Sequence, residues 1–221
     1  MKYRTEPAGN FRRIFAVKEF GCVKNGERGG LIECEDNLSH EGEAWIFHDA
    51  RVSGQSEVFG QSRVFGQSRV FGQSRVFGQS EVFDDAEVYG QSKVFGQSRV
   101  FGQSRVFGQS EVFGQSRVFG QAIVFGQSKV FGQSRVFGQS RVSGQSEVFG
   151  QAIVSKSLFS GTGLFNWTNL PNGLVIGCEL STLEEWEAKI EKLKTIYDLK
   201  WVALLEALIP ALKIDRERIT G

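Results

Sequence analysis

Few residues of this chain could do acid–base chemistry, and they lie near its N-terminus. The chain has two histidines, His40 and His48, and an acidic residue directly follows each of them, Glu41 and Asp49. An imidazole that a carboxylate orients can act as a general base if a substrate pocket lies within hydrogen-bond reach. The residues leave a second interpretation open, in which these charges are solvated and His48 is an exposed turn residue.

The element that must position these histidines and carboxylates is a six-residue unit, Val-Phe-Gly-Gln-Ser followed by Arg, Glu or Lys. It repeats from Ile46 to about Ser157, with nineteen unit starts and no insertion. One unit cannot bury its own apolar face, so a short fixed period predicts a solenoid in which stacked units form the core. Because the period never breaks, no loop leaves the coils to shape an acceptor site.

The alternation within a unit predicts which side chains point inward. Successive residues of a strand point to opposite sides, so Ser and Val share one side while the charged residue and Phe share the other. Burying an unpaired charge in every unit would be costly, which places Val and Ser inside. The Ser hydroxyls are then packing groups bonded along the ladder, and Gly-Gln forms the corner.

This inward pattern resembles the hexapeptide signature of left-handed parallel β-helices. The resemblance implies three hexads per triangular coil, about six coils and a left-handed winding. Phe departs from the signature, which more often has Gly, Ala, Asp or Glu after the aliphatic residue. A flattened coil of two hexads remains the alternative geometry.

The composition divides the chain into three parts. Residues 1–43 are expected to form an N-terminal β cap, with strand-like runs at 11–17 and 31–34 and a turn-rich stretch at 24–30. Residues 44–157 form the repeat. Open solenoid ends expose unpaired backbone groups and core, so atypical end segments are expected.

Residues 158–221 are predicted to form a C-terminal hairpin and helical cap. Two apolar runs, 164–167 and 174–178, flank a turn and predict the hairpin. The segment 181–185 has capping-box spacing, and apolar residues recur at helical spacing after it. We expect the helix to pack on the last coil; docking of a partner is the alternative.

The start of the chain adds a second resemblance. Val17-Lys18-Glu19-Phe20-Gly21-Cys22, Gly29-Gly30-Leu31-Ile32-Glu33 and Ala44-Trp45-Ile46-Phe47 resemble the opening of a group of prophage and enterobacterial left-handed β-helix proteins. These proteins are often labelled transferases on the basis of their fold. The uniform hexads would also suit a repeat-expanded or consensus-designed variant.

Hexapeptide-repeat proteins include many acyltransferases that use acyl-CoA or an acyl carrier. The family resemblance implies a histidine base on the helix, at a cleft between subunits, and makes His40 or His48 the candidate here. Both residues lie at the N-terminal edge of the repeat, His40 before it and His48 in its first unit. We therefore expect no catalysis and no cofactor, with acyl transfer from acyl-CoA as the alternative.

The stronger expectation is a binding surface made of the outward rows. With three hexads per coil, one flank aligns Phe59, Phe77, Phe95, Phe113, Phe131 and Phe149, and one charged ladder contains Arg63, Arg99, Arg117 and Arg135. Stacked aromatics stiffen a solenoid. Long apolar rows exceed what soluble monomers usually expose, so we expect a homo-oligomer or a host protein partner. Arg beside Phe also permits cation–π contacts.

Charge and composition exclude other partners. The net charge is +1, with 26 Lys+Arg against 25 Asp+Glu, so no field directs the chain to nucleic acid or an anionic membrane. Interleaved Arg and aromatics suggest single-strand binding, but the interspersed Glu residues and a convex rod argue against it. No apolar run is long enough to span a membrane and no signal peptide is visible, so a cytoplasmic location is expected.

Two further groups of residues could bind or react. The three cysteines, Cys22, Cys34 and Cys178, have no metal-ligand spacing and are expected to be reduced. Asp84 and Asp85 replace Gly-Gln in one unit. They could bind a hard cation such as Ca²⁺, but turn chemistry is the favoured interpretation.

Overall fold

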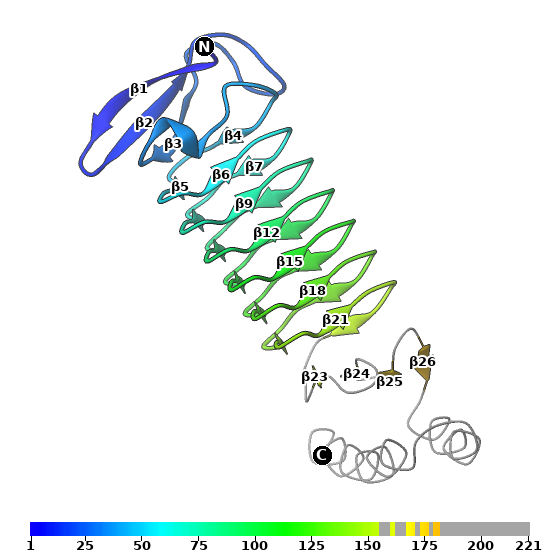
Figure 1. The fold of residues 1–221 in the computed structure, drawn as a ribbon. Helices are drawn as coiled ribbons and strands as arrows, with labels where there is room; N and C mark the ends of the chain where they lie inside the picture. Colours follow the sequence, from blue (N-terminus) through cyan, green and yellow to red (C-terminus); the bar gives the residue numbers. More distant parts are fainter. Residues whose placement is uncertain (155–159, 162–166, 171–172, 177–178, 182–221) are drawn as a thin grey trace, which may run out of the picture.

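The computed structural model describes residues 1–154 together with four short strands beyond them, at 160–161, 167–170, 173–176 and 179–181. The chain forms a parallel β-solenoid whose coils stack into a straight rod, with a hairpin at the N-terminal end (Figure 1). Three strands make one coil, and each strand pairs in parallel with the strand 18 residues later. The three-sided coil predicted from the hexads is confirmed.

Three parallel sheets form the three faces of the rod. The β7 face consists of β4 (Trp45–Ile46), β7 (Arg63–Val64), β10 (Glu81–Val82), β13 (Arg99–Val100), β16 (Arg117–Val118), β19 (Arg135–Val136) and β22 (Ile153–Val154). The β5 face consists of β5 (Arg51–Val52), β8 (Arg69–Val70), β11 (Glu87–Val88), β14 (Arg105–Val106), β17 (Ile123–Val124) and β20 (Arg141–Val142). The β6 face consists of β6 (Glu57–Val58), β9 (Arg75–Val76), β12 (Lys93–Val94), β15 (Glu111–Val112), β18 (Lys129–Val130) and β21 (Glu147–Val148).

The cap begins the solenoid instead of only covering it. Strands β1 (Tyr3–Ala8) and β2 (Phe11–Ala16) form an antiparallel hairpin, and β3 (Arg28–Ile32) pairs with both β2 and β5. A short 3-10 turn, η1 (Glu35–Asn37), follows, and Leu38 bridges in parallel to Val58. These elements add a turn before the hexads, so the rod has about seven turns, where the hexads alone predicted about six.

The inward residues form a core that runs along the rod axis. The inward Val residues of the repeat are at most 2% exposed and the inward Ser residues at most 1%. Ser98 is typical: its Oγ lies 2.9 Å from the carbonyl oxygen of Phe95 and 3.2 Å from that of Val112. The predicted inward pattern and the role of the Ser hydroxyls are confirmed.

The backbone of each hexad bonds to the next coil at three points. In one unit, Phe95 N–H donates to Val112 at 3.0 Å, Gln97 N–H to Gly114 at 2.7 Å and Arg99 N–H to Ser116 at 2.9 Å. The corner glycines have positive φ, for example 74° at Gly96, a conformation that L residues rarely adopt. Backbone hydrogen bonds therefore join the corners, as well as the strands, to the next coil.

At the C-terminal end, β24 (Trp167–Leu170) pairs antiparallel with β25 (Gly173–Ile176), so a hairpin is present, but β24 shares only Trp167 with the run 164–167 that was expected to form its first strand. The strands β23 (Ser160–Gly161) and β26 (Glu179–Ser181) complete this sheet. The predicted helical cap lies outside the described residues.

Candidate functional site

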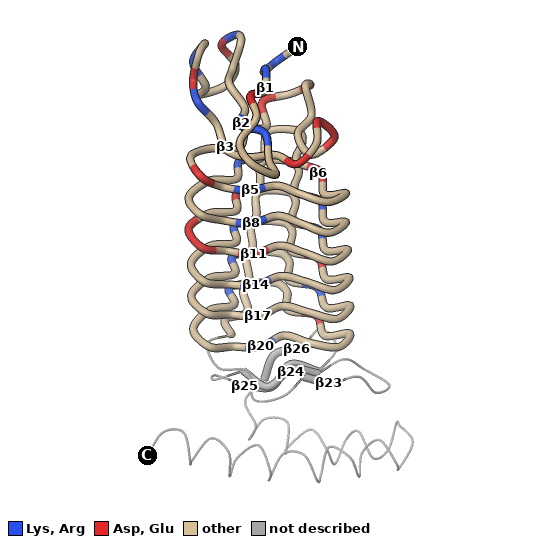
Figure 2. Tube along the Cα trace, turned by 90° about the vertical axis from the view of Figure 1, so that its left-hand side faces the viewer, with Lys and Arg blue, Asp and Glu red and all other residues tan. Residues whose placement is uncertain are grey.

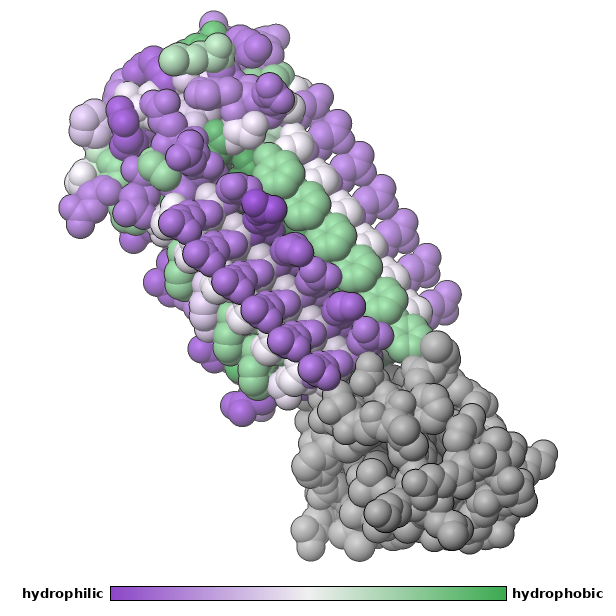
Figure 3. Space-filling view, viewed as in Figure 1, coloured by the Kyte–Doolittle hydropathy of each residue, from purple (hydrophilic) through white to green (hydrophobic). Residues whose placement is uncertain are grey.

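Columns of stacked aromatic rings run along the faces of the rod. The β6 face carries Phe59, Phe77, Phe95, Phe113, Phe131 and Phe149, with centroids 4.8 to 5.5 Å apart. The β7 face carries Phe65, Phe83, Phe101, Phe119 and Phe137, at 4.7 to 5.0 Å, with Phe47 edge-on at the top. The β5 face carries the shorter column Phe71, Tyr89, Phe107 and Phe125. Figure 3 shows such a stripe of hydrophobic surface between polar columns.

The stacking decides what the rings can bind. Within each column neighbouring rings are close to parallel, for example 2° between Phe65 and Phe83 and 5° between Phe95 and Phe113. Inside a column both faces of a ring are covered by the neighbouring rings, and the rings are half-buried, so mainly their edges meet solvent. Single-strand binding needs open ring faces on which bases stack. These columns offer apolar edges to a partner but no such platform.

The charged residues also form columns, one on each face (Figure 2). On the β6 face the ion pairs Glu57–Arg75, Lys93–Glu111 and Lys129–Glu147 span 3.1, 3.0 and 3.6 Å. All six charged residues of that column therefore have a partner within it. Such exposed pairs contribute at most about 1 kcal/mol each, but they leave the β6 face electrically balanced.

The β7 face is not balanced. Glu81 pairs with Arg63 at 3.8 Å and with Arg99 at 3.0 Å. Among the described residues, no carboxylate lies within ion-pair distance of Arg117 or Arg135. The column from Arg63 to Arg135 therefore carries an excess of positive charge.

The predicted binding residues thus lie on two faces of the rod. The Phe59 column is on the β6 face and the Arg63 column is on the β7 face, on either side of one edge. A column of glutamines forms this edge. A groove of about 540 Å³ lies between them and the β7 charges, and its lining residues are Gln79, Glu81, Gln97, Arg99, Gln115, Arg117, Gln133 and Arg135.

The glutamine columns are a feature that the sequence analysis missed. Gln79 Nε2 donates to Gln61 Oε1 at 2.9 Å, and Gln97 Nε2 donates to Gln79 Oε1 at 3.0 Å. The same contact recurs down to Gln133. The sequence does contain the signal for these columns, because a Gln recurs at an 18-residue spacing. The ladder holds each amide in place, so this wall of the groove is preorganised.

In the described part of the chain, Arg and Phe of the repeating coils do not form the cation–π contacts that their proximity permits. Those that the structure contains involve the cap: Lys2 over Phe20 at 5.1 Å, Arg4 over Phe15 at 4.7 Å, and Arg51 over Phe11 at 5.9 Å. The reason is that coil Phe faces are already occupied by other rings. The Arg side chains of the β7 face instead line the glutamine groove.

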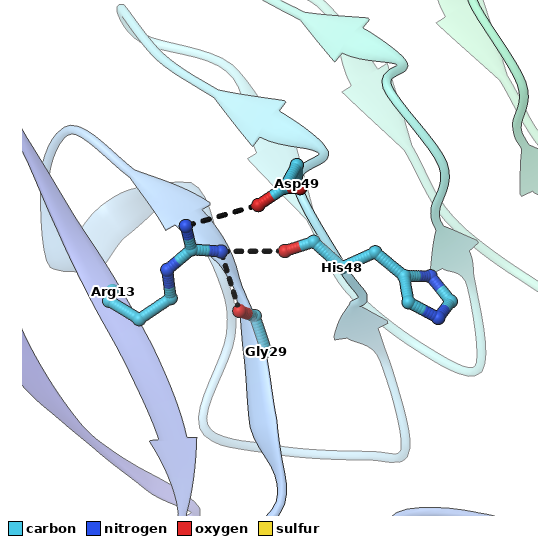
Figure 4. A network of polar contacts seen from close by, with 4 residues as sticks. All are labelled: Arg13, Gly29, His48 and Asp49. Carbon is cyan, nitrogen blue, oxygen red and sulfur yellow. Dashed lines mark hydrogen bonds and ion pairs between the residues drawn. The ribbon is translucent and has the colours of Figure 1, made fainter.

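His48 occupies a corner position that is glycine in most units, with φ of 52°. The carboxylate of Asp49 pairs with Arg13 at 3.2 Å, and Arg13 also donates to the carbonyl oxygens of Gly29 and His48. Figure 4 shows the imidazole directed away from this network. Asp49 therefore does not orient His48 as a base, and the interpretation of His48 as a turn residue is supported.

His40 lies beside a cavity of about 730 Å³, whose other lining residues include Cys34, Glu57 and Phe59. Its ring stacks on Tyr3 with centroids 4.2 Å apart, and burial lowers its pKa below 6.5. Its Nδ1 accepts a hydrogen bond of 3.2 Å from the backbone N–H of Lys2. A neutral imidazole with this partner has its proton on Nε2. In this arrangement Nε2 is a donor and cannot take a proton from a substrate.

Asp84 and Asp85 form a corner. Asp84 has φ of 58°, and its Oδ2 accepts a hydrogen bond from Gly102 N–H at 3.2 Å. In the described part of the chain no group of three or more His, Cys, Asp or Glu side chains could hold a metal ion. The geometry supports turn chemistry over a Ca²⁺ site. Cys22 and Cys34 are free thiols, and Cys178 lies outside the described residues.

Comparison with known proteins adds no assignment. No protein-family model matches the chain, and no curated protein matches it significantly. Among the described residues, no helical segment has the length and apolar character needed to cross a bilayer. A functional proposal for this chain has to rest on the surfaces of the rod itself.

Proposed function

We propose that this protein is a non-catalytic structural and binding β-solenoid that associates with another copy of itself or with a host protein through its aromatic and Arg columns. The observation that carries the proposal is the continuous stripe of ring edges on a rigid rod. Contiguous apolar surface of this kind marks interaction sites in soluble proteins. The resemblance of the first fifty residues supports a prophage origin, and the composition supports a cytoplasmic location.

The β6 face is the best candidate for self-association. Its six Phe residues form an unbroken column, and its charges are paired within their own column. Two such faces can meet without bringing unpaired like charges together. Two β7 faces would oppose their excess Arg residues, and like charges across an interface cost binding free energy.

The experiment is to measure the native mass in dilute solution by light scattering on a sizing column, against the 24.6 kDa chain. We expect a dimer or larger species. Phe95→Ser with Phe113→Ser should reduce the mass to that of one chain, whereas the matched β7-face change, Phe101→Ser with Phe119→Ser, should leave assembly intact. A monomeric wild-type protein would refute self-association, and equal effects of both variants would refute the assignment to the β6 face.

A hexapeptide-repeat acyltransferase is the second candidate, supported by the cavity beside His40. This proposal predicts that an acyl-CoA raises the Tm and that His40→Ala abolishes turnover. The tautomer held by Lys2 argues against it. If acyl-CoA leaves the Tm unchanged, the enzyme candidate fails.

A further inference from the structure

The β7 face keeps positive charge that its own neighbours do not neutralise. Arg99, Arg117 and Arg135 face one another in register on three successive strands. Only Arg99 of these three has an ion pair among the described residues, with Glu81. Like charges at facing positions of neighbouring strands are destabilising. An anionic partner on this face would remove that repulsion.

The same face supplies an apolar column beside the Arg column. Two residues beyond each Arg lies a stacked ring, and these are Phe101, Phe119 and Phe137. Alternate residues of a strand point to the same side and lie about 6.6 Å apart. On the other side of the Arg column lies the groove walled by glutamines. Charge and apolar surface therefore run in parallel along the rod, within the width of one secondary-structure element.

The spacing of the Arg column selects the kind of partner. Neighbouring strands lie about 4.8 Å apart, so three Arg residues span about 9.6 Å. Carboxylates at positions i, i+4 and i+7 of an α-helix span about 10.5 Å, close enough for flexible Arg side chains to reach. Carboxylates on one side of an extended peptide are about 6.6 Å apart. Three of them would therefore not match the spacing of three Arg residues. Nucleic acid bases would find no open ring face.

We propose that the β7 face binds an acidic amphipathic helix of a partner protein. Its carboxylates lie against Arg99, Arg117 and Arg135, and its apolar side chains lie against the edges of Phe101, Phe119 and Phe137. This is a helix laid along the face of the rod, with acidic and apolar residues on adjoining stripes. The inference rests on the proposed binding function and names the chemistry of the partner.

The β5 face provides the matched control. Its charged column is interrupted by Glu87 and by Ile123, and its ring column ends at Phe125. Arg105 there is as exposed as Arg117 and stands at the same position of its hexad. Removing either guanidinium changes the net charge equally, so Arg105→Gln and Arg117→Gln differ in the face and in the column neighbours of the Arg that is removed.

The test titrates the full chain into a fluorescently labelled helical peptide with Glu at i, i+4 and i+7 and Leu on the adjoining stripe, and follows anisotropy. A second peptide with Gln in place of each Glu is the control. Arg117→Gln and Arg135→Gln should each weaken binding by about threefold, as for exposed ion pairs. Arg105→Gln should change it less than twofold. Raising the salt should weaken binding of the Glu peptide, since exposed pairs are screened.

Several results would overturn the inference: no binding of the Glu peptide, equal binding of the Gln peptide, or equal losses for Arg105→Gln and Arg117→Gln. Tighter binding of labelled oligothymidylate than of the Glu peptide would assign the face to nucleic acid instead. The native mass of the same samples distinguishes a failure of this inference from a failure of the proposed function. An oligomer that does not bind the peptide would refute this inference and leave the proposed function standing.

Discussion

The corner glycines allow a test of how closely the coils stack. Gly96 has φ of 74°, and a methyl group added there would lie 2.9 Å from the backbone nitrogen and 3.1 Å from the carbonyl oxygen of Gly114. Gly144 has φ of 70°, yet among the described residues a methyl group added there would meet nothing within 4 Å. The two positions share the backbone conformation and differ in the described atoms that surround them.

The expected cost follows from these two contributions. A left-handed conformation costs an L residue about 1 to 2 kcal/mol, and overpacking against atoms that cannot move adds about 1 to 3 kcal/mol. The Gly114 carbonyl cannot move freely because it accepts the 2.7 Å hydrogen bond from Gln97 N–H. Gly96→Ala should therefore destabilise the protein by about 2 to 5 kcal/mol, and Gly144→Ala by about 1 to 2 kcal/mol. The lower entropy of the unfolded alanine chain offsets both equally.

The assay is urea unfolding followed by circular dichroism, with both variants and wild type compared at their midpoints. The predicted order of midpoints is wild type, then Gly144→Ala, then Gly96→Ala. If the two variants unfold at the same urea concentration, backbone strain alone accounts for the cost. Contact between the coils would then contribute nothing to the difference, which would refute the predicted order.

Three further predictions use the same unfolding assay. Val94→Ala should destabilise by about 2 kcal/mol, since it removes two fully buried methyl groups; a loss below half that value would mean that the core is loosely packed. Ser98→Ala should cost no more than about 1 kcal/mol, because Ala122 already occupies the equivalent position. The pKa of His40 is lowered from 6.5 by burial, so the unfolded chain takes up its proton first and stability should fall as the pH drops below about 6.5. His40→Gln should reduce that pH dependence and His48→Gln should retain it; equal behaviour would show that another group titrates.

The sequence was sufficient to predict the coil because the same alternation of side chains recurs in every hexad. A charged residue and a Val alternate in each unit, and only one orientation buries no charge. The pairing of charges follows from the same 18-residue spacing, because residues of opposite sign that lie one coil apart form ion pairs. Arg117 and Glu57 belong to similar hexads, yet only Glu57 has a neighbour of opposite sign in its column.

The cap was predicted less well, for physical reasons that particular residues show. Residues 24–30 were expected to be turn-rich, but Arg28–Ile32 forms a strand. A methyl group at Gly30 would overlap Ile46 Cγ2, so this glycine permits close packing instead of making a turn. The strand β1 was missed because its polar sequence, with Pro7, gives no clear alternation. The state of His40 depends on a backbone N–H from 38 residues away, which no local pattern reveals.

The identical contacts between coils have a consequence for how such a protein changes over generations. An insertion or deletion of 18 residues within the uniform hexads restores every hydrogen bond, ring stack and buried Val, and alters only the length of the rod, by about 4.8 Å. The reach of the molecule can thus evolve in discrete steps while its two ends, and whatever they contact, stay unchanged.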